Sequence, residues 1–467
     1  MRRNFLLAFS ALVLFGCQDE SEILRPEAFP VMAEVVPLTL IVDEVKTLPG
    51  LGDRSAAFAV NRHGLIVGYS GEWDSPSAVL WEGGGISSLE KPALAQPAAA
   101  EGVNSRRETV GWVGYSTGAD RRASYWNQDG QKTLGPTNLR TWAYDIDDSG
   151  RIVGVEEGED DIKRAIQWAN ANTTRTFLVE PAEMTWSEAF ATNNRGQVVG
   201  WAETEASPYP VGVLWEDGER RVLPASAAAY SWKAEDINEL GQIVGQLDAG
   251  TPERQATLWL EGADAEPVLL SDFLSVAQGI NNLGQVVGWV QTGGDRRAVL
   301  WMDGLTYPLA TPFGQAAEAF SINDDGVVVG LEGAGTAQRA LRWQVPIRAS
   351  VEVEPGSGPV RLNGGGKVTV AVYGSPWFNV SQIDVGSLTL GDESGSDTPV
   401  LRNRNGRVDF KFTDADRDGH LDLVVSFDRR QLVANGDLEA GTERLFLLGR
   451  RTDGRPLRGV GAVTVAH

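Results

Sequence analysis

An internal repeat constrains the fold of this chain more than any other feature of its sequence. One pattern of about 44 residues recurs seven times, and each copy joins a segment such as INNLGQVVG to a later Trp. The first segments close at Gly68, Gly111, Gly154, Gly200, Gly245, Gly288 and Gly330, and the later Trp are Trp81, Trp126, Trp168, Trp215, Trp259, Trp301 and Trp343. A unit of this length cannot bury its apolar side chains alone, so neighbouring copies must pack against one another.

Turn residues divide each copy into four short strands. The side chain of Asn or Asp at the first position of a four-residue turn stabilises the turn, and Gly at the fourth position allows a left-handed exit. Asn61 with Gly64 and Asn281 with Gly284 are examples. A second signal, Asp-Gly between apolar segments, follows the repeat Trp and predicts a hairpin. Four antiparallel strands, repeated seven times, predict an all-β, seven-bladed β-propeller over residues 42–345.

The two ends of the repeat array predict a closed ring. The seventh copy stops at Trp343, before Pro346, and lacks the outer strand that ends in Leu. The segment VKTLPGLG before the first copy matches the outer strand of the second copy, QKTLGPTN, and places Leu48 where Leu134 stands. We therefore expect an N-terminal strand to complete the seventh blade and leave no free sheet edge. An open β-solenoid is the alternative, but it needs capping segments that the sequence does not contain.

The repeat resembles the HAF family of bacterial extracellular repeats, in which Ile-Asn-x-x-Gly-x-Val-Val-Gly precedes His-Ala-Phe-x-Trp. The segments INELGQIVG, INNLGQVVG and INDDGVVVG carry the first half of this pattern, within a match that spans residues 42–345. The eponymous His is absent from every copy. The resemblance implies an extracellular repeat protein and brings no activity with it.

The N-terminus predicts export and a lipid anchor. Arg2 and Arg3 precede an apolar run that ends at Gly16 and is too short to span a bilayer, which is typical of a signal peptide over residues 1–16. LFGC resembles the lipobox of bacterial lipoproteins, which implies acylation of Cys17 and attachment to a membrane. Residues 17–41 would form the tether, and Gln18, in place of Asp, favours the outer membrane within the cell envelope. The alternative is an ordinary secretory signal with an incidental Cys.

Residues 346–467 lack the repeat and predict a β-sandwich, from alternation such as Val368, Val370 and Val372. Within this segment, DADRDGHLD places carboxylates at alternate positions of a tight loop, where they suit a hard divalent cation. The loop leads into a strand, so it resembles integrin-type and dockerin-like calcium loops, and we expect a structural calcium. The alternative is a solvated acidic turn without a metal. The candidate ligands are Asp414, Asp416, Asp418, Asp422 and the backbone carbonyl of His420.

The two sides of the predicted ring differ. An up-and-down blade places its first and third turns on one side, where they are short and alike. It places its second turn and the connection between blades on the other side, where the loops vary, as binding loops do. Four Trp in or beside these loops are candidate binding residues, although packing against a neighbouring blade would also explain them: Trp73, Trp142, Trp186 and Trp232.

Basic residues recur at the start of the third strand of several copies. They suggest either a crown that binds anions or ion pairs with adjacent acids such as Asp120, Asp161 and Asp295, and we favour the ion pairs. The recurring residues are Arg122, Arg164, Arg297 and Arg339.

Composition narrows the function. A net charge of −22 argues against a nucleic-acid partner, and three His with one Cys leave little for zinc or redox chemistry. We therefore predict a non-catalytic envelope lipoprotein that displays the propeller to bind a glycan or an envelope protein, or for surface assembly. The alternative is a carbohydrate-active enzyme, a glycoside hydrolase or lyase, with a carboxylate pair on the variable side.

Overall fold

A computed structural model describes most of the chain. The described residues are 43–92, 95–115, 120–136, 138–169, 174–178, 186–204, 207–250, 254–260, 266–356, 358–363, 365–392 and 398–466. The predicted signal peptide, Cys17 and the tether to residue 41 lie outside them.

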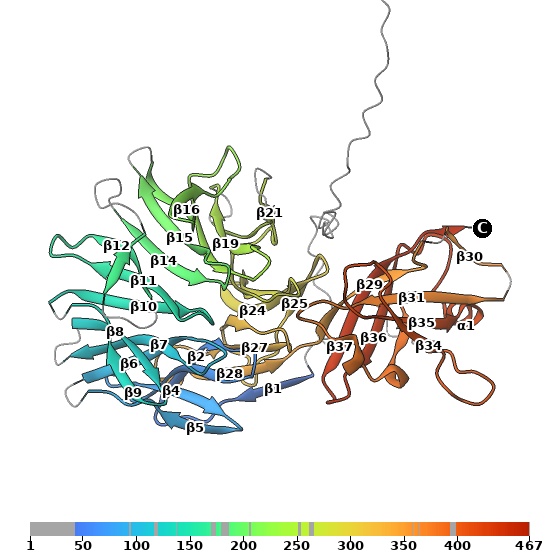
Figure 1. Cartoon of the computed structure of the whole chain (residues 1–467), viewed down its shortest axis with the longest axis horizontal. Helices are drawn as coiled ribbons and strands as arrows, with labels where there is room; N and C mark the ends of the chain where they lie inside the picture. The colour runs from blue at the N-terminus through green and yellow to red at the C-terminus, as the bar shows by residue number, and fades with distance from the viewer. Residues whose placement is uncertain are drawn as a thin grey trace, which may run out of the picture. The chain divides into compact units, whose positions relative to one another are not determined.

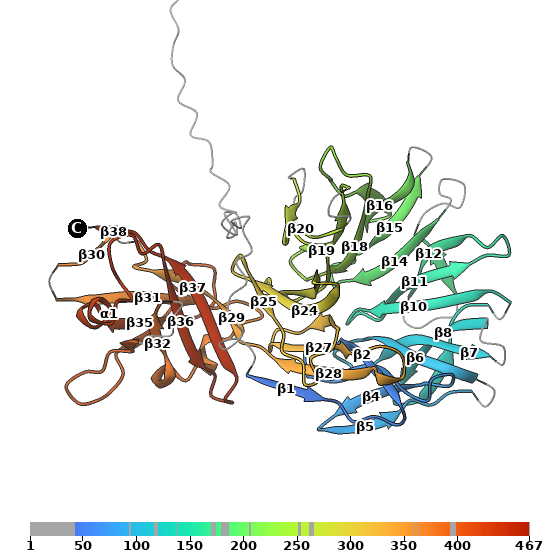
Figure 2. The same cartoon turned by 180° about the vertical axis from the view of Figure 1, so that it is seen from behind.

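Seven four-stranded antiparallel sheets form the blades of a β-propeller within the described residues, as the repeat predicts (Figures 1 and 2). Each blade runs from an inner to an outer strand in chain order, except the last. Blade 1 is β2 (Arg54–Val60), β3 (Ile66–Gly71), β4 (Ser77–Glu82) and β5 (Gly85–Ser88); blade 2 is β6 (Ala95–Val103), β7 (Thr109–Tyr115), β8 (Asp120–Asn127) and β9 (Gly130–Thr133); blade 3 is β10 (Arg140–Ile146), β11 (Arg151–Glu157), β12 (Lys163–Ala169) and β13 (Arg175–Phe177). Blade 4 is β14 (Ser187–Thr192), β15 (Val198–Thr204), β16 (Ser207–Glu216) and β17 (Glu219–Val222); blade 5 is β18 (Ser231–Ile237), β19 (Ile243–Asp248), β20 (Gln255–Trp259) and β21 (Val268–Leu269); blade 6 is β22 (Ser275–Ile280), β23 (Val286–Thr292), β24 (Asp295–Met302) and β25 (Leu305–Pro308).

Blade 7 is closed by the N-terminal strand. It contains β26 (Ala317–Ile322), β27 (Val327–Glu332), β28 (Arg339–Gln344) and, as its outer strand, β1 (Glu44–Thr47). The blue β1 pairs antiparallel with the orange β28, with Val45 opposite Trp343 (Figure 1). Leu48 N then donates to Ala340 O at 2.9 Å, as Leu134 N donates to Ala123 O at 2.8 Å in blade 2. The predicted closure is confirmed, and it removes the free edge that an open stack would leave.

The Asn-x-x-Gly turns form a hydrogen-bonded ring, which we call the asparagine ring. In blade 1, Asn61 Oδ1 accepts from the backbone N–H groups of His63 and Leu65, both at 3.0 Å, and so holds its own turn. Its Nδ2 donates to the backbone carbonyl of Asn104, the equivalent residue of blade 2, at 2.8 Å. The same link recurs from Asn104 to Asp147, Asn193 to Asn238, Asn238 to Asn281, Asn281 to Asn323, and Asn323 back to Asn61, at 2.9–3.1 Å. Six of the seven turns are therefore tied to the next blade by a buried hydrogen bond.

Asp147 interrupts this ring in blade 3. Its Oδ1 accepts from Arg151 N at 2.9 Å, so the turn itself is intact. Its Oδ2 is buried without a hydrogen-bond partner, and Arg151 Nε lies 3.9 Å from it. The Asp side chain has no N–H group to donate, so the described residues contain no matching link from blade 3 to Asn193 in blade 4.

The repeat Trp and the closing Gly both stand at tightly packed positions of the blades. All seven Trp are at most 4% exposed, which confirms that they pack inside the propeller. A Cβ added to Gly68 would lie 2.0 Å from Ala56 O on the neighbouring strand, and the other six closing Gly approach backbone just as closely, at 1.9–2.1 Å. Only Gly fits this position, because the inner strand carries a β-bulge there in every blade.

The C-terminal segment forms one curled sheet around its own core rather than two separate packed layers. An isolated bridge between Val400 and Phe427 joins the chain after one edge strand to β35, and the core includes Val370, Leu423 and Leu447. A short helix, α1 (Arg429–Asn435), follows β35. The sheet order is β33 (Thr398–Pro399), β32 (Thr389–Gly391), β36 (Arg444–Arg450), β37 (Pro456–Ala462), β29 (Ile347–Val353), β31 (Lys367–Tyr373), β35 (Asp422–Asp428) and β34 (Phe410–Thr413); β30 (Val360–Arg361) pairs with β38 (Val465–Ala466).

We expect Asp147→Asn to stabilise the propeller by about 1 kcal/mol, because the new amide supplies the missing donor of the asparagine ring. The loss of the loose ion pair with Arg151 offsets little of this gain. Thermal and urea unfolding measure the change. Asn281→Asp is the matched opposite variant and should destabilise by a similar amount. An unchanged or lower stability of Asp147→Asn contradicts the role of the ring.

Candidate functional site

Strand directions define two faces of the propeller. The turn face holds the asparagine ring. On the opposite side, which we call the variable face, inner strands begin, second strands end and third strands begin; its loops include residues 72–76, 158–162 and 333–338. These loops differ in length and sequence, as expected for a surface that binds partners.

The four predicted Trp belong to four different blades, and the structure does not gather them into one cluster. Trp73 in blade 1 is 54% exposed, and Trp186, just before β14 in blade 4, is 38% exposed. Trp142 in blade 3 and Trp232 in blade 5 are half-buried within inner strands. The indole N–H of Trp232 donates to Leu223 O at 3.0 Å, so this ring packs between blades 4 and 5.

A feature that the sequence analysis did not find is a set of basic side chains that lie over aromatic rings on the variable face. The signal for it was the recurrence of basic residues at the start of third strands, but which ring each one covers depends on neighbouring strands and loops. The distances from the cation to the ring centroid are 4.1–5.4 Å, within the range of cation–π contacts. The pairs are Arg54 with Trp73, Arg121 with Trp112, Arg122 with Tyr115, Lys163 with Trp142, Lys233 with Trp201, Arg296 with Trp289 and Arg339 with Phe313.

The expected ion pairs of the four recurring arginines form only in part. Arg164 pairs with Asp160, at 2.5 Å, rather than with Asp161. Among the described side chains, which do not include that of Asp120, no ion pair involves Arg122, Arg297 or Arg339, so the preference for ion pairs was wrong for Arg297 and Arg339. Arg122 and Arg339 stack on aromatic rings instead.

The inner strands place one half-buried side chain from each blade at the β-bulge. Four of these seven residues are aromatic and three are polar: Phe58, Tyr144, Phe190 and Phe320, and Glu101, Glu235 and Gln278. Phe58 contacts Phe320 across the junction of blades 1 and 7, and Tyr144 contacts Phe190 across that of blades 3 and 4, with ring centroids 5.5 Å apart in both pairs. The bulge therefore lines the inside of the ring with large side chains.

Carboxyl groups of this inner region have shifted pKa values. Burial raises the pKa of Glu101 to about 7, although Trp112 Nε1 donates to its Oε1 at 3.0 Å. Burial also raises the pKa of Glu235 to about 7, and the charge of Glu188 adds to this shift while Lys233 opposes it. These groups can therefore donate or accept a proton near neutral pH.

Three further carboxyl groups of the inner strands are held in place by hydrogen bonds. Glu188 accepts from Lys163 Nζ at 2.9 Å and from the Tyr144 hydroxyl at 3.1 Å. Asp145 and Asp236 each accept a backbone N–H of the next blade at 2.9 Å, and burial raises their pKa values to about 6 and about 7. Their hydrogen bonds give these three groups structural roles between blades.

The acidic loop of the C-terminal sheet brings three of its predicted ligands together. Carboxylate oxygens of Asp414, Asp416 and Asp422 lie within 4.8 Å of one another. Asp422 is fully buried and accepts from Gly374 N at 2.9 Å and from Ala415 N at 2.6 Å. Asp418 is outside this group, and its Oδ1 accepts from the backbone N–H of His420 at 2.7 Å.

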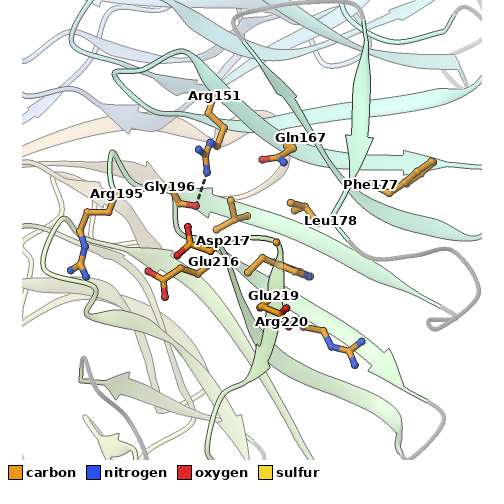
Figure 3. Close-up of a pocket in the computed structure, with 13 residues that line it drawn as sticks. Arg151, Gln167, Phe177, Leu178, Arg195, Gly196, Glu216, Asp217, Glu219 and Arg220 are labelled. Carbon is orange, nitrogen blue, oxygen red and sulfur yellow. Dashed lines mark hydrogen bonds between the residues drawn. The ribbon is translucent and has the colours of Figure 1, made fainter.

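A cavity of about 560 Å³ lies between blades 3 and 4 on the turn face. Arg151 reaches across it and donates to Gly196 O at 2.5 Å (Figure 3). Its wall carries both charges, including Arg220, Glu216 and Asp217. The cavity occupies the same blade junction at which Asp147 interrupts the asparagine ring.

Comparisons with known proteins give only distant structural matches. No family model and no curated protein matches the chain. A prolyl endopeptidase structure has a TM-score of 0.43 at 10% identity, over 71% of this chain and 54% of that one; Pyrococcus horikoshii acylaminoacyl peptidase has 0.43 at 13%, over 69% and 58%. TolB from Acinetobacter baumannii has 0.37 at 9%, over 60% and 79%. This chain thus spans little more than half the length of the two peptidases, and likenesses of this size say nothing about activity.

The raised pKa of Glu235 predicts a pH-dependent stability. In the unfolded chain this carboxyl ionises near 4.5, whereas in the fold it ionises at about 7, so its contribution is full below pH 4.5 and is lost as the pH rises to about 7. We expect Glu235→Gln to stabilise the protein at pH 8 by roughly 1–2 kcal/mol and to have little effect at pH 4.5. Thermal unfolding across this range measures it. Glu72→Gln, at an exposed loop position, is the control, and an equal effect of Glu235→Gln at both pH values contradicts the assignment.

Proposed function

We propose that this protein is a lipid-anchored, non-catalytic component of the bacterial cell envelope that binds a glycan or an envelope protein through the variable face of its propeller. The observation that carries the proposal is the set of cations stacked on aromatic rings. The basic residues of these pairs come from six of the seven blades. A broad set of similar groups suits recognition of an extended partner better than chemistry at one point.

The anchor in this proposal is the lipid on Cys17, inferred from the lipobox-like LFGC. The described part of the chain contains no helix long and apolar enough to cross a membrane. Residues 17–41 would link the lipid to the propeller, and the outer membrane is the preferred location.

A carbohydrate-active enzyme is the second candidate, and one observation favours it. Glu101 and Glu235 combine pKa values of about 7 with positions on the inner strands, as a general acid requires. Against this, Glu101 is bonded to Trp112, and Glu188, a third carboxyl of the inner strands, is bonded to Lys163 and Tyr144.

Screening the mature chain on a glycan array and against purified envelope proteins, followed by product analysis, tests the proposal. We expect saturable binding without products. Trp73→Ala should weaken binding about tenfold, because this ring is exposed on the variable face, whereas Trp377→Ala in the C-terminal sheet should not. Polysaccharide cleavage that Glu235→Gln abolishes would establish the enzyme instead. Equal effects of the two Trp variants on affinity would show that the ligand does not bind at the variable face.

We further propose that the acidic loop binds calcium as a structural ion. Asp414, Asp416 and Asp422 supply the oxygen ligands that calcium prefers, and no ion pair among the described residues neutralises them. Relief of their mutual repulsion would stabilise the turn between β34 and β35.

Calcium should raise the unfolding temperature of the mature chain by several degrees, and excess chelator should reverse the effect. Asp416→Asn should abolish the calcium response, because it removes one of the three grouped carboxylates. Glu439→Gln, an exposed change in the same sheet unit, should keep it. Identical unfolding curves with calcium and with chelator would end this proposal.

A further inference from the structure

Four arginines of adjacent blades 7, 1 and 2 share an unusual environment on the variable face. Each is half-buried, and its guanidinium lies over an aromatic ring. The pairs are Arg339 over Phe313 at 4.5 Å, Arg54 over Trp73 at 4.6 Å, Arg121 over Trp112 at 4.1 Å and Arg122 over Tyr115 at 4.2 Å. We call these four residues the arginine sector.

None of the ion pairs within the described residues involves an arginine of this sector. Arg54 donates to the Tyr69 hydroxyl at 2.7 Å and Arg339 donates to Ala337 O at 3.0 Å, so their contacts are with neutral groups. Glu101 lies near Arg121, but it is bonded to Trp112, and its pKa of about 7 leaves it only partly ionised at neutral pH. Among the described side chains, no carboxylate therefore forms an ion pair with the sector.

Blade 3 shows that this arrangement is not general. Its basic residues on the same face all have acidic partners: Arg140 with Glu157 at 3.0 Å, Lys163 with Glu188 at 2.9 Å and Arg164 with Asp160 at 2.5 Å. The chain carries 63 acidic and 41 basic residues, so partners are not scarce. Even the exposed acids of the loops around blade 1, Asp53, Glu72 and Asp74, form no ion pair with the sector. Among the described side chains, blades 7, 1 and 2 thus carry four arginines that have no ion pair and lie over aromatic rings, whereas Arg297 of blade 6 has no ion pair and no such ring contact.

Stacking prepares such an arginine to bind an anion. A guanidinium over a ring uses its flat face for the aromatic contact and keeps N–H donors at its edge, in the fork that matches a carboxylate. Because the ring already restricts the side chain, binding loses less conformational entropy than it would at a free surface arginine. The sector therefore contains preorganised sites for carboxylates.

Two rings of the sector can also contact a ligand. Trp73 and Phe313 are each 54% exposed, and the arginine covers only part of each ring. Aromatic rings at this exposure bind the apolar faces of sugar rings by stacking. A partner that combines sugar rings with carboxylates would engage both kinds of group at once.

We infer that the arginine sector binds an acidic polysaccharide, with its carboxylates at the guanidinium edges and its sugar rings against Trp73 and Phe313. This inference rests on the proposed binding function of the variable face and specifies its ligand class. A polysaccharide with at most one carboxylate per sugar suits the sector better than a nucleic acid, whose duplex carries one charge per about 1.7 Å of helix axis and would be repelled by Asp53, Glu72 and Asp74.

Calorimetric titration of the mature full-length chain with matched polymers tests the inference. The carboxylated probes are polygalacturonate, alginate and hyaluronan, and the neutral probes are methyl-esterified polygalacturonate and dextran. Single-stranded DNA is the other polyanion. We expect saturable binding of at least one carboxylated polymer that is at least tenfold tighter than binding of the neutral probes and DNA, and that weakens as salt rises.

Arg121→Gln combined with Arg339→Gln should weaken that binding at least tenfold, because two charged forks are lost. The corresponding double Lys variant keeps the charge and should show intermediate affinity, which also controls for any loss of folding in the Gln variant. Arg140→Gln, at a paired arginine of blade 3, is the matched control and should bind as the unchanged protein does. Thermal unfolding of every variant accompanies the titrations.

The outcomes separate this inference from the proposed function. Equal binding of polygalacturonate and its methyl ester, or tighter binding of DNA, overturns the acidic-polysaccharide inference and leaves a binding face. If the Arg140→Gln variant and the double Gln variant bind the carboxylated polymer with equal affinity, the ligand lies outside the sector and the inference is overturned as well. Binding of an envelope protein alone sustains only the proposed function. No binding to any polymer or envelope protein contradicts both.

Discussion

A hydrogen bond from one side-chain amide to the backbone carbonyl of the next blade is the interaction on which the propeller depends most. Each Asn of the asparagine ring fixes its own turn through Oδ1 and the neighbouring blade through Nδ2, so a single residue type sets both local and long-range geometry. The link from Asn323 to Asn61 joins residues 262 positions apart and connects the last blade to the first. Because these groups are buried, an unmade bond costs more than a made bond contributes.

Much of the fold follows from the sequence because it depends on short-range chemistry repeated seven times. The Asn-x-x-Gly turns, the Trp that pack between blades and the match of Leu48 to Leu134 predict four strands per blade and closure by an N-terminal strand, and the structure has both. The prediction for the C-terminal segment is coarser: alternation identified strands there, but the curl that joins the chain near Val400 to β35 depends on contacts far apart in the chain.

The candidate site was less predictable because its features arise between blades. The position of Lys233 over Trp201 joins blades 5 and 4, and the pKa of Glu101 depends on burial that no local pattern encodes. The recurring arginines were visible, yet whether Arg339 meets a carboxylate or Phe313 is decided by the loop before blade 7. In the acidic loop, the spacing identified Asp414, Asp416 and Asp422 as neighbours. Asp418 is not part of this group, and its side chain accepts a hydrogen bond from the backbone N–H of His420.

The way the ring is closed also determines how the molecule bears load. Everything N-terminal to residue 43 connects to the propeller through β1, a strand of four residues whose partner is β28. Tension transmitted along that segment would shear this short ladder first, while the other six blades, each built from one continuous stretch of chain, would carry almost none of it. The seventh blade is therefore the part of the propeller that yields first under tension, and separation of β1 from β28 would leave the other six sheets intact.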